Sequence, residues 1–142
     1  MTAQSLDRRR FLILGGGTMA LTACSSASVT PAQVGDVPAM NVSSLTVGTL
    51  EPIGNLAVCL GRDAKGVYAM TLTCTHMGCT IGNVTFQKLT CQCHSSQFDG
   101  NGSVVSGPAT QSLQHFAVTV DASSNLTIHG GQLVTSDTRL VV

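Results

Sequence analysis

Four cysteines and two histidines lie within the stretch from Cys74 to Phe98. They form two groups: the first box, residues 74–79, reads Cys-Thr-His-Met-Gly-Cys, and the second box, residues 91–98, reads Cys-Gln-Cys-His-Ser-Ser-Gln-Phe. Each box offers one Cys-His pair and one further cysteine. Two thiolates and two imidazoles suit a soft or borderline transition metal far better than calcium or magnesium. A donor set divided into two sulfurs and two nitrogens suits a [2Fe–2S] cluster that has cysteines on one iron and histidines on the other.

Zinc is the main alternative, because it also binds cysteine and histidine. Common structural zinc sites space their ligands as Cys-x(2–4)-Cys and His-x(3–5)-His. The single residue between Cys74 and His76 fits that spacing poorly. A zinc-stabilised binding protein is therefore disfavoured, and so is a fold in which the cysteines form two disulfides and the histidines take no part.

The two boxes resemble the cluster-binding boxes of Rieske iron–sulfur proteins, and the resemblance extends over about residues 42–130. In that family the first cysteine and the histidine of each box bind the [2Fe–2S] cluster. The resemblance also implies a disulfide between Cys79 and Cys93 that ties the two loops together. That disulfide is typical of cytochrome bc-type and arsenite-oxidase-type Rieske subunits, and oxygenase-type Rieske ferredoxins lack it. The ligands implied here are Cys74, His76, Cys91 and His94.

Three further residues match family positions that tune the cluster. Ser96 matches a serine whose hydroxyl donates a hydrogen bond to a bridging sulfide. Phe98 stands where high-potential members have a tyrosine that donates to a ligand cysteine, here Cys74. Residues 106–109, which include Pro108, resemble the proline loop that covers the cluster. The resemblance therefore implies a reduction potential below that of tyrosine-bearing relatives.

The N-terminus has the pattern of an export signal. Arg8, Arg9 and Arg10 precede an apolar run that ends near Ala23. That run is too short for a membrane-spanning helix, which needs about 20 apolar residues, and is typical of a signal peptide. The arginines followed by Phe-Leu resemble a twin-arginine signal, a route that exports folded proteins. We expect residues 1–23 to be a signal peptide.

The residues at the end of this run resemble a bacterial lipobox, Leu-Thr-Ala-Cys, which ends at Cys24. In such proteins the cysteine becomes the first mature residue and carries lipid, so Cys24 is the expected lipidation site and membrane anchor. Residues 24–41 are rich in Ser, Ala, Pro and Gly and are predicted to form a flexible tether. Residues 42–130 form the expected Rieske domain, and residues 131–142 form a C-terminal extension without an assigned role.

The remaining chain predicts an all-β fold. Fifteen glycines and a body rich in Val, Thr and Ser indicate short strands and turns. We expect eight to ten strands and, by the resemblance, a Rieske-type antiparallel β-sandwich with a small cluster-binding subdomain. Cys59 is predicted to be a buried thiol, and His115 and His129 to be ordinary strand residues. The expected strands are residues 44–50, 55–60, 67–73, 84–86, 88–90, 113–120 and 126–129.

The resemblance implies an exported, membrane-associated electron-transfer protein on the extracytoplasmic face of a prokaryotic membrane. Its expected partners are redox proteins such as a cytochrome b or c, in a quinol/cytochrome respiratory pathway, with quinol as a candidate donor. The alternative is the small subunit of an extracytoplasmic molybdenum oxidoreductase such as arsenite oxidase, in which the molybdenum subunit carries out the catalysis. Without residues 1–23 the chain has four basic and six acidic residues, so it lacks the basic surface of a nucleic-acid-binding protein.

Overall fold

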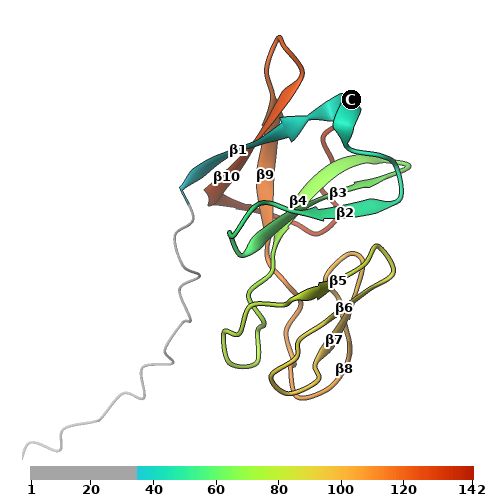
Figure 1. Ribbon diagram of the computed structural model, residues 1–142, viewed down its shortest axis with the longest axis vertical. Helices are drawn as coiled ribbons and strands as arrows, with labels where there is room; N and C mark the ends of the chain where they lie inside the picture. The colour runs from blue at the N-terminus through green and yellow to red at the C-terminus, as the bar shows by residue number, and fades with distance from the viewer. Residues whose placement is uncertain (1–34) are drawn as a thin grey trace, which may run out of the picture. The chain divides into compact units, whose positions relative to one another are not determined.

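The computed structural model describes residues 35–142, which form two antiparallel β-sheets (Figure 1). The expected signal peptide, Cys24 and most of the expected tether lie outside the described residues. No helix within residues 35–142 has the length and apolar character needed to cross a bilayer. The helical part of this region is one 3-10 turn, η1 (Val42–Ser44). The strands are β1 (Asp36–Asn41), β2 (Thr49–Pro52), β3 (Val58–Asp63), β4 (Gly66–Thr71), β5 (Asn83–Val84), β6 (Lys88–Thr90), β7 (Gln97–Asp99), β8 (Val104–Ser106), β9 (His115–Val120) and β10 (Asn125–Val134).

The large sheet contains six strands in the order β1-β10-β9-β4-β3-β2. Its hairpin β3–β4 is mainly apolar and is buried along most of both strands. In β10 the burial alternates, so that Leu126 and Ile128 face the core while their neighbours are more exposed. This alternation is the pattern of a strand with one buried face. Side chains from distant parts of the described chain, including Val37, Leu60 and Phe116, meet in one hydrophobic core.

The small sheet contains four strands of two or three residues, in the order β5-β6-β7-β8. The first box lies between β4 and β5, and the second box begins directly after β6 and runs into β7. A second hydrophobic core, which includes Ile81, Leu89 and Phe98, extends from this sheet to Met70 of β4. Both boxes thus lie on loops that adjoin the small sheet, as the resemblance predicts.

The ten strands confirm the predicted all-β fold, with differences at both ends. Residues 36–41 were expected to belong to the tether, but they form β1, which pairs with β10 through Asp36↔His129 and Val37↔Ile128. The predicted end of the domain at residue 130 is also wrong. Strand β10 continues past Gly130 to Val134 after a register shift, and Leu140 forms an antiparallel bridge with Val67. The first expected strand, 44–50, begins only at Thr49 because η1 and a turn precede it.

Single residues agree with their predicted roles. Cys59 is fully buried in β3, where burial raises the pKa of its thiol to about 12. His115 is buried in β9, and His129 is a partly buried residue of β10. Nε2 of His129 forms a hydrogen bond of 2.8 Å with the hydroxyl of Thr119, and Nδ1 of His129 lies 3.0 Å from a carboxylate oxygen of Asp36. These contacts join β1, β10 and β9 on the solvent face of the large sheet.

Candidate metal centre

The first box folds into a tight loop that continues from β4. The backbone N–H of Cys74 donates to the carbonyl of Cys79 at 2.8 Å, and the N–H of Gly78 donates to the carbonyl of Cys74 at 2.8 Å. Gly78 has a φ of +77°, in the left-handed region that glycine adopts most easily. The loop therefore turns back on itself within six residues and buries the Cys74 side chain, which is 2% exposed.

The second box repeats this conformation. The N–H of Cys91 donates to the carbonyl of Ser96 at 2.9 Å, and the N–H of Ser95 donates to the carbonyl of Cys91 at 3.0 Å. Ser95 occupies the left-handed position with a φ of +62°, where the first box has glycine. Both loops thus begin with a buried cysteine and close four and five residues later. Equivalent loops on two elements are a way to present equivalent ligands from two sides.

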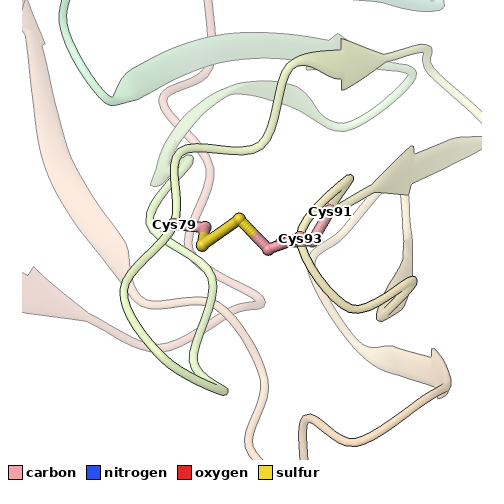
Figure 2. A group of neighbouring side chains, drawn as sticks. All are labelled: Cys79, Cys91 and Cys93. Atoms are coloured by element: carbon pink, nitrogen blue, oxygen red, sulfur yellow. A yellow bond between two sulfur atoms is a disulfide. The ribbon is translucent and has the colours of Figure 1, made fainter.

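A disulfide between Cys79 and Cys93 joins the two loops, which confirms that part of the sequence-based expectation. Figure 2 shows the bond crossing from the loop of Cys79 to the loop that carries Cys91 and Cys93. The sulfurs of these three cysteines lie within 4.8 Å of one another. Because two of them form the disulfide, this trio offers only one thiol and is not a metal site by itself. The free cysteines of the described chain are Cys59, Cys74 and Cys91.

Two of these thiols, Cys74 and Cys91, lie against each other. Burial raises the pKa of Cys74, the N–H of His76 and the hydroxyl of Ser96 donate to its sulfur and oppose that rise, and the hydrogen bond with Cys91 adds to it. Both side chains are at most 2% exposed. Two buried thiols in contact, with hydrogen-bond donors directed at one sulfur, form a site suited to thiolate ligands.

The two box histidines also meet. Their rings are 4.8 Å apart between centroids and nearly perpendicular, with His76 half-buried and His94 exposed. Nδ1 of His76 is buried and has no hydrogen-bond partner among residues 35–142. A buried ring nitrogen without a partner is costly unless a ligand or metal takes it. Two adjacent thiols, two adjacent imidazoles and this orphaned nitrogen fit a [2Fe–2S] group held by two cysteines and two histidines.

Comparison with known proteins decides the family. The Rieske [2Fe-2S] domain family matches residues 27–117. The chain belongs to this family. Its cofactor is accordingly a Rieske [2Fe–2S] cluster, as predicted from the boxes.

Similar proteins place this Rieske domain more closely. It is 37% identical over 108 residues to the cytochrome b6-f complex iron-sulfur subunit of Synechococcus sp. (strain WH7803), covering 75% of this chain and 60% of that subunit. It is 45% identical over 62 residues to the same subunit of Synechococcus sp. (strain CC9605), covering 43% of this chain and 35% of that one. The chain therefore spans less than two thirds of these relatives.

Solved Rieske structures share the fold. The plasma membrane Rieske protein of Synechocystis PCC 6803 superposes with a TM-score of 0.51 at 26% identity, covering 65% of this chain and 97% of that one. A naphthalene 1,2-dioxygenase superposes with a TM-score of 0.56 at 17% identity, covering 69% of this chain and 26% of the other. The second likeness shows the fold alone.

The residues expected to tune the Rieske cluster surround the two thiols. The Ser96 hydroxyl is fully buried, donates to Cys74 and accepts the N–H of Ala109 at 3.1 Å. Gly107, at a φ of +96°, packs so closely on Ser96 that a side chain would meet its Cα at 2.6 Å. The loop that contains Pro108 is thus held against the second box. Phe98 is fully buried in the same core as Cys74.

Two contacts at this site were not predicted. The hydroxyl of Thr75 donates to the carbonyl of Gln111 at 2.6 Å, which fastens the first box to the chain beyond Pro108. Met77, between the histidine and the glycine of the first box, is 71% exposed. The position of Met77 within the first box could have signalled this, because a tight loop leaves its central residue outside.

Proposed function

We propose that this protein transfers single electrons through a cluster held by Cys74, His76, Cys91 and His94. The observation that supports this ligand set most strongly is the orphaned Nδ1 of His76 beside the Cys74–Cys91 thiol pair. The other two box cysteines are already joined as a disulfide. The four remaining donors therefore have no competing role in the described chain.

When bound, the cluster accepts and returns one electron, and its two neutral imidazole ligands give Rieske centres potentials of roughly −150 to +300 mV. The protein's part is to hold and insulate it. Buried Cys74 and Cys91 supply thiolates from inside the domain, and the Ser96 hydroxyl directs a hydrogen bond at that side. Exposed His94 and half-buried His76 face the solvent side, where a partner can approach.

The pathway that we propose is a quinol/cytochrome chain in which a cytochrome b-type protein is the partner. This proposal is supported by the similarity to iron-sulfur subunits of cytochrome b6-f complexes. The N-terminal pattern supports export by the twin-arginine route and attachment to the membrane through lipid on Cys24, which places the domain on the extracytoplasmic face. A cytochrome c is the expected acceptor and a quinol the candidate donor.

The test is purification from native membranes through a tag that leaves the N-terminus free. Electron paramagnetic resonance of the reduced protein and its iron content identify the cluster, and zinc without iron would refute it. Co-purification of a cytochrome b supports the pathway. A large molybdenum subunit in its place would retain the ligand assignment and overturn the pathway. Release into the soluble fraction by Cys24→Ala tests the lipid anchor.

A further inference from the structure

The turn between β7 and β8 is held by three side chains from outside the small sheet. The hydroxyl of Tyr68 donates to the carbonyl of Gly100 at 2.7 Å. Nε2 of His115 lies 3.0 Å from the carbonyl of Asn101, and because a carbonyl can only accept, Nε2 carries the proton. Nη2 of Arg139 donates to Oδ1 of Asn101 at 2.8 Å. We call these contacts to Gly100 and Asn101 the base tie.

Arg139 is the centre of the base tie. Its Nε donates to a carboxylate oxygen of Asp63 at 2.7 Å, and its guanidinium lies 4.0 Å from the ring centroid of Tyr68. Nη1 donates to the carbonyls of Ser136 and Thr138 at 2.7 and 2.9 Å. The side chain is only 10% exposed. A planar donor group with this many fixed acceptors has one orientation, which a lysine could not reproduce.

The base tie lies at the turn between β7 and β8, and the disulfide lies at the two boxes, to which β4 and β7 lead. Strand β4, which contains Tyr68, runs on into the first box. Strand β7 begins at the end of the second box and ends at the tied turn, and β8 leads from that turn to the loop of Pro108. The base tie therefore joins the strand of the first box to the hairpin of the second box. The disulfide makes the same connection at the cluster end.

We propose that Arg139 is a positioning residue that keeps the two boxes aligned through the base tie when the disulfide is absent. With the disulfide intact, a covalent bond prevents the boxes from separating even when the contacts of the base tie are lost. Without it, and with no cluster bound across the boxes, separation is limited by the contacts of Arg139, Tyr68 and His115. Arg139 lies beyond residues 27–117, which the family matches, so this part of the tie is supplied by the C-terminal segment. The proposal rests on the proposed function in one respect, which is that the two boxes are the loops that bind the cluster.

The test is hydrogen exchange in the full chain prepared without its cluster, with Arg139→Met made in the native background and in a Cys79→Ser, Cys93→Ser background. With the disulfide present, we expect Arg139→Met to raise exchange at the Gly102 amide about tenfold or more, the factor that follows from losing a hydrogen bond to a charged group. The amides of Gly78 and Ser95 should change less than about twofold. Without the disulfide, the same substitution should raise exchange at those two amides about tenfold.

Arg62→Met is the matched control. Arg62 is also partly buried and donates to two carbonyls, those of Val42 and Leu45, but these contacts stay within the large-sheet region. It should show no dependence on the disulfide. Equal effects of Arg139→Met on Gly78 and Ser95 in both backgrounds, or the same conditional pattern in Arg62→Met, would overturn the proposal.

Asn101→Ala keeps the test decisive where Arg139→Met does not fold, because it removes only the side-chain acceptor of the tie. It should reproduce the conditional pattern, and its failure to do so in a folded protein would also overturn the proposal. Arg139→Lys should restore only part of the protection. These exchange measurements do not depend on electron transfer. The proposed function can therefore fail while the role of the base tie is confirmed, and the role of the base tie can fail while the proposed function is confirmed.

Discussion

The two sheets are built in different ways. The large sheet has strands of up to ten residues and a core to which both ends of the described chain contribute, from Val37 to Leu140. The small sheet has strands of two or three residues, too short to be stable by their own pairing. Its core includes Cys74 and Cys91, the two thiols proposed to bind the cluster.

This difference separates the sources of stability. The large sheet is stabilised mainly by apolar burial, which needs no cofactor. Besides its own core, the small sheet depends on the disulfide, the base tie and, when it is bound, the cluster, because metal binding contributes directly to folding. We therefore expect cofactor chemistry and folding to be coupled in the small sheet and independent in the large one.

The largest expected effect follows from removing one ligand. Cys91→Ala should abolish the Rieske resonance signal and lower the protection of β5–β8 amides from exchange, while β3 and β4 stay protected. Cys59→Ala is the matched control, because Cys59 is an equally buried free thiol that belongs to β3. It should retain the cluster. His94→Ala should also abolish the signal, and full intensity in that variant would contradict the ligand set.

Removing the disulfide should have the next largest effect. Cys79 and Cys93 are 14 residues apart, and closing a loop of that size is worth about 2–4 kcal/mol. Cys79→Ser with Cys93→Ser should lower the stability of the small sheet by about that amount and shorten cluster lifetime, with ligation unchanged. Chemical denaturation followed by the visible cluster band and by far-ultraviolet circular dichroism measures the two sheets separately. A parallel loss in both signals would show that the sheets unfold as one unit.

The buried histidine at the base should give stability a pH dependence. Burial lowers the pKa of His115. The hydrogen bond to the Asn101 carbonyl raises this pKa in part, and the positive charge of Arg139 lowers it further. As pH falls, the unfolded chain therefore binds a proton on His115 at a higher pH than the folded chain does. The contribution of neutral His115 to the stability of the folded state is full above pH ~6.5 and is lost as pH falls below that value. The limiting slope is about 1.4 kcal/mol per pH unit.

His115→Gln removes this titration and isolates it from the other histidines. The difference in unfolding free energy between wild type and His115→Gln should shrink, or change sign, from pH 7 to pH 5. Denaturant titrations at each pH provide the measurement. A difference that is constant across this range would mean that His115 has the same proton affinity in the folded and unfolded chain.

Through the family resemblance, the sequence predicted the disulfide between the two boxes far better than the edges of the fold. Cys74 to Cys79 and Cys91 to Ser96 are local loops, and their residue order alone determines which side chains they present. Burial of Cys59 followed from its apolar neighbours. The strand at Asp36–Asn41 was missed because it has Pro38 and one buried residue, and it exists only through pairing with a segment about ninety residues later.

The base tie could not be predicted either. The family resemblance placed the end of the domain at residue 130, whereas Gly130 and Gly131 lie where β10 changes register against β9. Arg139 gives no local signal, because its partners Asp63, Tyr68 and Asn101 are distant in sequence. Such contacts depend on the topology that brings distant segments together, and a single sequence does not encode that topology as a pattern.

The smallest expected effect concerns the potential. Phe98 is fully buried in the core that contains Cys74, and its ring has no hydrogen-bond donor. By the family resemblance, the hydroxyl of Phe98→Tyr should donate to the Cys74 thiolate and stabilise the reduced cluster, which carries one more negative charge. This hydrogen bond stabilises both the oxidised and the reduced cluster, so only the difference between the two stabilisation energies changes the midpoint potential. Since about 59 mV corresponds to a tenfold change in a one-electron equilibrium, we expect the midpoint to rise by some tens of millivolts.

Phe116→Tyr makes this a comparison between the two sheets. Phe116 is also buried, but it lies in the core of the large sheet. Its new hydroxyl would have no thiolate to reach, so the substitution should cost about 1–3 kcal/mol of stability, as for an unpaired buried donor, and leave the midpoint unchanged. Redox titrations of both variants at one pH, with thermal unfolding alongside, distinguish the cases. If Phe98→Tyr instead loses stability without a rise in midpoint, its hydroxyl is unpaired and residue 98 does not face Cys74.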